Sequence, residues 1–272
     1  MKILKETLSY ISKNLIFVLG FALLPACFIG GLLQPFAITN FLVDYKTLTV
    51  SNFGDILSPL FGVSWVQLLN WFLAFILFVA IFAAFLGNIE NHFKSGKLNL
   101  SATLNLVNNT VLIVLAYTIL FVLGFLLLKF ALALIVFIMH IVFGRLGSEP
   151  TMALYSCNVV LTIVSMFFSG VLFSYLMLAL IDTIMCGYSL GTSFSDANDL
   201  MNKRVYTVLL FVVLPFLIVT PLVVLGKVFG FGVIANIVGI LILFMYYPVL
   251  FFTMYFDYSR LNRYDNIKRY YY

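Results

Sequence analysis

The sequence predicts an all-α integral membrane protein, a polytopic bundle of about six transmembrane helices. Of the 272 residues, 64% are hydrophobic and only 9% are charged, whereas a soluble domain carries about 25% charged residues because its surface faces water. The apolar residues gather in runs long enough for a helix to cross a hydrocarbon core of roughly 30 Å. The basic residues lie mainly between these runs.

Six apolar runs divide the chain, and we expect them to form a single integral membrane domain over residues 1–272. The runs cover residues 15–33, 65–87, 111–143, 156–181, 205–226 and 233–256. The mixed segment 34–64 between the first two is expected to be an extramembrane loop, since it contains prolines and charged residues.

The first run follows a short basic N-terminus with Lys2 and Lys5, which resembles the start of a signal peptide. No small-x-small cleavage site follows it, so we expect a retained first helix. Small residues four positions apart, at Ala22, Ala26 and Gly30, suit the close approach of a second helix.

The third run is the longest, with 33 residues interrupted only by Lys129 and His140. One helix of this length would measure about 50 Å, so it would have to tilt or protrude from the bilayer. The alternative is a helical hairpin with Lys129 at its tip, with two spans of about 15 residues that are short for a bilayer. No Gly-Pro turn marks a bend, and we therefore favour one long helix.

The basic residues orient the predicted spans. With the N-terminus in the cytoplasm, six spans place 11 of the 15 basic residues in cytoplasmic segments, as the positive-inside rule requires. These are Lys2, Lys5, Lys13, Lys94, Lys97, Lys203, Arg204, Arg260, Arg263, Lys268 and Arg269. Both termini are thus expected in the cytoplasm. The formal net charge of +5 then predicts contact with anionic lipids and excludes nucleic acid as a partner.

The two long cytoplasmic loops are similar when one is shifted by 94 residues. Ser101 then matches Ser195, and Asn108 matches Asn202. Spans two and four superpose, as do spans three and five, which predicts an internal repeat of span, loop helix and span.

Each of these loops is expected to contain a short amphipathic helix on the cytoplasmic leaflet. In the second loop, Ser193 would cap a helix with one apolar face. This face consists of Phe194, Ala197, Leu200 and Met201. In the first loop, Leu100, Leu104 and Val107 have similar spacing. Either such a helix only orients the next span, or its apolar face binds a membrane-protein partner or a second copy of the chain.

Two segments carry a resemblance to a known family. They are Ser193-Phe-Ser-Asp-Ala-Asn-Asp-Leu-Met-Asn-Lys-Arg204, directly before a span, and Ser95-Gly-Lys-Leu-Asn-Leu-Ser101. Their pattern resembles bacterial multi-pass proteins of the glycerophosphoryl diester phosphodiesterase membrane-domain type, over roughly residues 65 to 260. In that family the module is sometimes fused to a soluble phosphodiesterase domain. The 272 residues leave no room for that domain and lack its acidic and histidine constellations, so we expect no activity to carry over.

Ionisable and helix-breaking residues in the spans are the candidate substrate-binding residues, because a charge in hydrocarbon costs several kcal/mol unless it is paired or hydrated. The candidates are Lys129, Asp182, Pro215 and Pro221. Lys129 either lines a cavity and binds a lipid phosphate, or extends to the outer interface. Asp182 either ends a helix in water or pairs with Lys203 or Arg204 beneath the bundle. The two prolines kink or break the fifth span.

No cofactor, metal site or catalytic constellation is predicted. His92 and His140 are 48 positions apart, with no carboxylate at ligand spacing. Cys27, Cys157 and Cys186 form no C-x-x-C pair, and we expect them to be small core residues. The single G-x-S-x-G match, Gly187-Tyr-Ser-Leu-Gly191, follows an apolar run and not a predicted strand, whereas a nucleophile elbow needs a strand before it.

These features favour a non-enzymatic multi-pass protein of the bacterial cell membrane, which handles lipid or serves another membrane protein as an accessory subunit. One alternative is a small transporter or flippase with a path between the repeats, lined by Lys129 and the breaks at Pro215 and Pro221. Another is a membrane enzyme that acts on phospholipid head groups.

Overall fold

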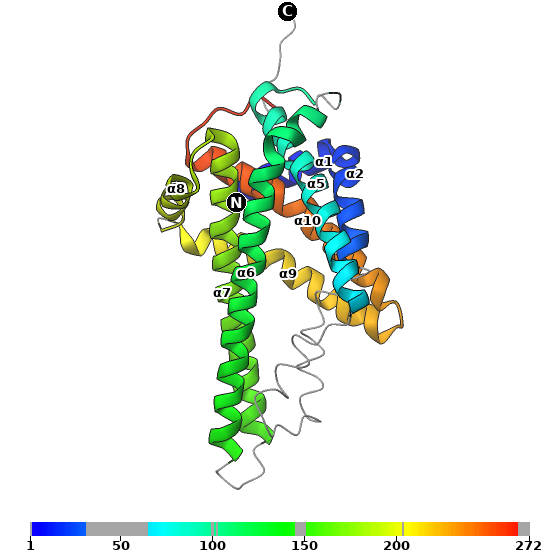
Figure 1. Ribbon diagram of the computed structural model, residues 1–272, viewed down its shortest axis with the longest axis vertical. Helices are drawn as coiled ribbons and strands as arrows, with labels where there is room; N and C mark the ends of the chain where they lie inside the picture. Colours follow the sequence, from blue (N-terminus) through cyan, green and yellow to red (C-terminus); the bar gives the residue numbers. More distant parts are fainter. Residues whose placement is uncertain are drawn as a thin grey trace, which may run out of the picture.

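The computed structural model describes residues 2–30, 65–98, 101, 103–144, 151–202 and 204–265. These residues form eight α-helices and no strand (Figure 1). The helices are α1 (Lys2–Lys13), α2 (Leu15–Phe28), α5 (Trp65–Ser95), α6 (Thr103–Gly144), α7 (Thr151–Cys186), α8 (Leu190–Asn202), α9 (Val205–Val228) and α10 (Gly232–Tyr258). The prediction of an all-α fold is confirmed.

The helices include enough long apolar segments for a multi-pass membrane protein. Candidate spans are Phe72–Ser95, Thr103–Leu128, Phe167–Cys186, Val205–Gly226 and Gly232–Tyr258. Helices α1 and α2 pass the same test only as a pair, and they meet at 90°. The described part of the chain therefore contains five candidate spans, or six if this bent pair counts as one. This agrees with the predicted six.

The first predicted span, 15–33, begins where α2 does, at Leu15, but a helix that was not predicted, α1, comes before it. The helical structure already begins at Lys2 and bends beside Asn14, whose backbone is not helical. The reason is a change in pattern: α1 buries Ile3, Thr7 and Tyr10 on one face and carries charges elsewhere, whereas α2 is apolar all round. A helix with the pattern of α1 is typical of a membrane surface. Residues 31–33 lie outside the described part.

Helix α6 is one continuous helix of 42 residues, about 63 Å long at 1.5 Å per residue. The favoured single helix is thus confirmed, and the hairpin with a tip at Lys129 is wrong. Helix α7 packs beside α6, and both project beyond the other helices (Figure 1). Helix α7 begins at Thr151 and ends at Cys186, so the helix extends beyond the predicted apolar run 156–181 at both ends.

The two predicted loop helices have different outcomes. In the second loop, α8 confirms a separate helix, but it begins at Leu190 and Ser193 lies buried inside it. The predicted cap at Ser193 is therefore wrong. Among the described residues of the first loop there is no separate α-helix: α5 continues to Ser95, and Leu104 and Val107 belong to the start of α6, while Leu100 lies outside the described part.

Buried contacts explain why α5 continues through its polar end. The Asn88 side-chain amide donates to the Ala84 carbonyl at 2.8 Å and to the Thr103 hydroxyl at 3.2 Å. Ile89 and Phe93 are fully buried. Since the residues described between α5 and α6 contain no counterpart of α8, the two predicted repeat units differ here, and the internal repeat stays a prediction.

Helix α10 is the central helix of the bundle and packs against α1, α2, α5, α7 and α9. Its residues from Tyr246 to Phe256 are all buried. The small residues of α2 allow the predicted close approach: Ala22 and Ala26 are fully buried. A Cβ atom added to Gly30 would lie 2.7 Å from the Cα atom of Ile237 on α10.

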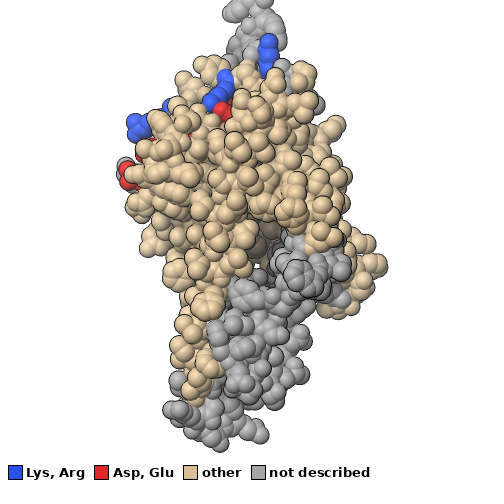
Figure 2. Space-filling model, in the orientation of Figure 1, with Lys and Arg blue, Asp and Glu red and all other residues tan. Residues whose placement is uncertain are grey.

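The charged segments meet at one end of the bundle, which we call the charged end. Lys2 at the start of α1 pairs with Asp257 at the end of α10, with 2.8 Å between Nζ and Oδ1. The Lys94 ammonium at the end of α5 donates to the Met185 carbonyl at the end of α7, at 3.1 Å. The charged side chains visible in Figure 2 lie at this end. The predicted grouping of these segments on one side is therefore consistent with their contacts.

A short segment after α10 closes the charged end. The Arg263 side chain, 8% exposed, pairs with Asp265 at 2.8 Å and with Glu6 on α1 at 3.2 Å. Its guanidinium lies 4.0 Å above the centre of the Phe93 ring on α5, and the Tyr264 N–H donates to the Phe93 carbonyl. This segment therefore holds α1, α5 and α10 together.

Candidate functional site

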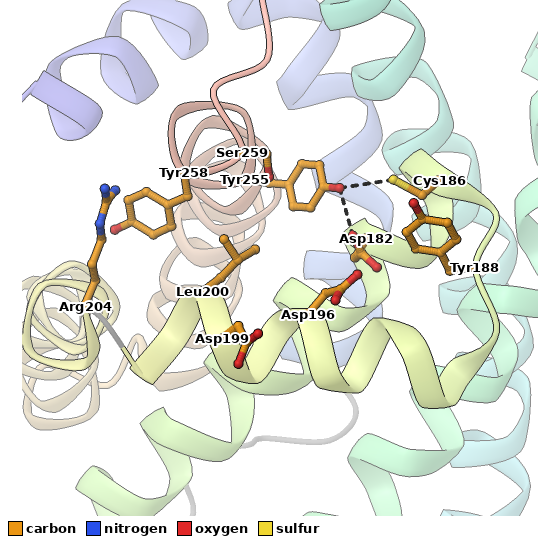
Figure 3. A pocket seen from close by; sticks show the side chains of 10 residues that line it. All are labelled: Asp182, Cys186, Tyr188, Asp196, Asp199, Leu200, Arg204, Tyr255, Tyr258 and Ser259. Atoms are coloured by element: carbon orange, nitrogen blue, oxygen red, sulfur yellow. Dashed lines mark hydrogen bonds between the residues drawn. The ribbon is translucent and has the colours of Figure 1, made fainter.

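A pocket of about 350 Å³ lies at the charged end, between the last turn of α7, the helix α8, the start of α9 and the end of α10 (Figure 3). Its lining is unusually polar for a molecule of this composition. It includes Asp182, Asp196, Asp199, Arg204, Cys186, Ser259, Tyr188, Tyr255, Tyr258 and Leu200. Three carboxylates and one guanidinium thus line the same pocket.

Asp182 is the most deeply buried charged residue of the pocket. It is 3% exposed, and its Oδ1 atom accepts a hydrogen bond of 2.8 Å from the Tyr255 hydroxyl. The other oxygen, Oδ2, is buried and has no hydrogen-bond partner among the described residues. Leaving such a group unpaired costs about 1–3 kcal/mol or more. A ligand that donates a hydrogen bond to Oδ2 would remove this cost when it binds.

Asp182 was predicted as a candidate site residue, and it does line this pocket. The alternative in which Asp182 pairs with Arg204 is not found, because Tyr255 is the partner of Asp182 and Arg204 lies over the Tyr258 ring. Lys203, the other predicted partner, lies outside the described residues.

The other two carboxylates are placed by α8. Its inner face buries Ser193, Ala197 and Met201, so helical periodicity turns Asp196 and Asp199 toward the open side, where both are exposed. The two carboxylates line the pocket with Leu200 between α8 and α10 (Figure 3).

Aromatic contacts anchor α8 to the spans. The Tyr175 hydroxyl donates to the Phe194 carbonyl at 2.9 Å, and the two rings stack with centres 5.5 Å apart. The Phe194 ring also tilts against Tyr117 of α6. The apolar face predicted to bind a partner, Phe194, Ala197, Leu200 and Met201, thus packs on the chain's own core. Partner binding through this face stays a prediction.

Arg204 begins the wall formed by α9. Its guanidinium carbon lies 4.2 Å from the centre of the Tyr258 ring, in an exposed position. A guanidinium has five N–H donors, and stacking on a ring leaves them free at its edge. The Tyr255 hydroxyl, on the same helix as Tyr258, lies 3.3 Å from the Cys186 sulfur. Cys27 and Cys186 are exposed, so the prediction of core cysteines is wrong for these two.

The remaining predicted site residues lie outside the pocket. Lys129 is 26 residues into α6, about 39 Å along the helix from Thr103, and its side chain lies outside the described part. Pro215 is buried and Pro221 is exposed, both within α9. The buried hydroxyl of Tyr246 donates to the Phe211 carbonyl at 3.1 Å, the carbonyl that Pro215 deprives of its helical partner. Pro215 therefore has a structural role here.

Sequence reasoning missed most of the pocket. Asp196 and Asp199 are exposed, away from the buried face of α8, and nothing in the sequence pattern connected them with Tyr255 and Tyr258 on α10. In the described part of the chain, no group of three His, Cys, Asp or Glu side chains is placed to hold a metal ion.

No family model, curated protein or solved structure matches this chain. The resemblance to the glycerophosphoryl diester phosphodiesterase membrane domain therefore stays a prediction. The function of the pocket has to be argued from its own chemistry and position.

Proposed function

We propose that this chain is a non-catalytic multi-pass protein of a bacterial cell membrane that binds a membrane lipid by its head group in the polar pocket. The observation that carries this proposal is the buried, unpaired Oδ2 of Asp182 in a pocket at the charged end. Apolar spans end and charged side chains begin at this level, which is where lipid head groups lie.

The outer surface of α9 supports binding of a lipid. Beyond Arg204, this helix exposes large apolar side chains, with Tyr206 86%, Leu210 62% and Leu217 70% exposed. This apolar surface begins beside the pocket and continues along α9, so the acyl chains of a bound lipid could pack against it. A head group in the pocket and chains along α9 would occupy one continuous site.

Binding is favoured over catalysis by the lining that the structure describes. It contains no histidine, and the Cys186 thiol lies beside the Tyr255 hydroxyl and not beside a base. The transporter alternative depends on Lys129, Pro215 and Pro221; neither proline lines the pocket, and the Lys129 side chain lies outside the described part. That alternative and an accessory role stay predictions.

The charged end belongs in the cytoplasm in this proposal, because 11 of the 15 basic residues lie in the segments assigned to that side. Single cysteines at Lys5, Lys97 and Tyr188, in a background without native cysteines, test this placement with a membrane-impermeant maleimide. All three should react only when the cytoplasmic face is exposed. Reaction of any one from outside intact cells contradicts the topology.

Purification in mild detergent, with mass spectrometry of bound lipids and proteins, tests the lipid-binding function. We expect about one retained lipid per chain and its loss in Ser259→Trp, which fills the pocket. Leu261→Trp is the matched control, since this residue of the same segment is 45% exposed and outside the lining. Equal lipid content in all three proteins contradicts the proposal, and a stoichiometric protein in place of lipid favours the accessory role.

A further inference from the structure

The polar groups of the pocket define the chemistry of its ligand. Exposed carboxylates on a helix, such as Asp196 and Asp199, are by themselves an ordinary hydrated surface. Asp182 is different, because it is 3% exposed and its Oδ2 has no partner among the described residues. An oxygen of this kind requires a hydrogen-bond donor, and a cationic donor suits a carboxylate best.

We propose that the pocket selects a primary ammonium group joined to a phosphate, as in the head group of an aminophospholipid such as phosphatidylethanolamine. The ammonium binds Asp182 Oδ2 together with Asp196 or Asp199, and the phosphate binds the N–H groups of Arg204. This inference rests on the proposed function, since it identifies the lipid class of the same site.

The arrangement of charge supports a ligand with both signs. The three carboxylates come from α7 and α8, whereas Arg204 stands at the start of α9 on another part of the wall (Figure 3). A simple anion would meet the carboxylates, and a simple cation would leave the guanidinium without an anionic partner. A pocket of about 350 Å³ lies within the range of roughly 300–1,000 Å³ that ligand pockets occupy.

The contacts of the tyrosines favour a primary over a quaternary ammonium. A trimethylammonium group has no N–H donor and is bound mainly by open aromatic faces. Arg204 already stacks on the Tyr258 ring, and the Tyr255 hydroxyl is held by Asp182. A primary ammonium instead offers three donors to the carboxylate oxygens.

A methylation series tests this selectivity with the full chain in detergent. The probes are dioleoyl-phosphatidylethanolamine, its N-methyl and N,N-dimethyl derivatives, and dioleoyl-phosphatidylcholine, with binding measured by native mass spectrometry after delipidation. We expect affinity to fall stepwise along the series, by about tenfold in total, as hydrogen-bond donors are lost. Equal binding along the series overturns the ammonium proposal but leaves lipid binding intact.

Two variants and one control locate the selectivity. Asp182→Asn and the double variant Asp196→Asn/Asp199→Asn should each lose most of the preference for the primary amine. The double variant changes only exposed side chains, so its fold is not at risk. Asp257→Asn, outside the pocket and paired with Lys2, should keep the preference. Persistence of the preference in both pocket variants overturns the proposal.

Soluble O-phosphoethanolamine separates this inference from the proposed function. If the lipid is the ligand, the soluble compound competes only at concentrations at least about a hundredfold higher, because it lacks the acyl chains that bind along α9. Competition at equal concentration supports the ammonium chemistry but overturns the lipid as its source. Absence of specific binding by every lipid in the series overturns the proposed function together with this inference.

Discussion

Replacement of Tyr246 by phenylalanine tests how the bundle accommodates a proline inside a span. Pro215 has no N–H, so the carbonyl of Phe211, four residues earlier in α9, lacks its usual helical partner. The Tyr246 hydroxyl of α10 donates to this carbonyl at 3.1 Å, and both residues are buried. Tyr246→Phe leaves this acceptor without a partner and out of reach of water.

The expected loss is about 1–3 kcal/mol, the cost of an unsatisfied buried polar group. Tyr247→Phe is the matched control on the next residue. The Tyr247 hydroxyl donates to the Val212 carbonyl at 2.8 Å, but Val212 also has the N–H of position 216 as its normal helical partner. Loss of the Tyr247 hydroxyl should therefore lower the stability by only about 0.5–1.5 kcal/mol, the net value of an ordinary hydrogen bond.

A double-mutant cycle with Pro215→Ala isolates the proposed contact. An alanine at position 215 restores the N–H that bonds the Phe211 carbonyl, so Tyr246→Phe should cost clearly less in this background. Thermal unfolding of the purified proteins in one detergent measures the four stabilities. The reasoning is refuted if Tyr246→Phe costs the same in both backgrounds, or if the Tyr247→Phe control is the more damaging change.

Two further predictions concern packing at the two ends of the bundle, with the same thermal unfolding as readout. Gly30→Ala places a Cβ 2.7 Å from the Ile237 Cα and should cost about 1–3 kcal/mol by overpacking. Gly20→Ala, within α2, meets nothing within 4 Å and should be neutral or stabilising; equal stability of both variants contradicts the close approach of this segment to α10. Arg263→Met leaves the Asp265 side chain, 4% exposed, without its cation and should cost about 3–5 kcal/mol. Unchanged stability of this variant shows that the segment after α10 does not hold the charged end together.

Long apolar runs made the spans predictable, and interruptions in pattern caused the errors. The residues before position 15 were interpreted only as a short basic N-terminus because of their lysines, although Ile3, Thr7 and Tyr10 form a buried stripe on α1. The end of α5 was interpreted as a loop because it is polar. Its polar groups are instead satisfied within the fold, as in the bond from Asn88 to the Ala84 carbonyl.

The candidate site was predictable only where a single residue carried the signal. Asp182 was identified because a carboxylate at the end of an apolar run is costly. Its partner Tyr255 lies 73 positions away on α10, and helical periodicity gives no information across that distance. Pairing with Arg204 was one of two alternatives for Asp182, and Arg204 instead lines the same pocket from a different wall. The packing of α7, α8, α9 and α10 around one pocket became visible only in three dimensions.

Site-specific photo-crosslinking in intact cells tests the central claim, that the pocket holds a lipid head group, most directly. Benzoylphenylalanine replaces Leu200 in the pocket or, as a control, Leu210, which is 62% exposed on the outer surface of α9. The account predicts lipid adducts at position 200 that are enriched in primary-amine head groups relative to those at position 210. Adducts of the same lipid composition at both positions, or adducts at position 200 that contain only protein, would contradict it.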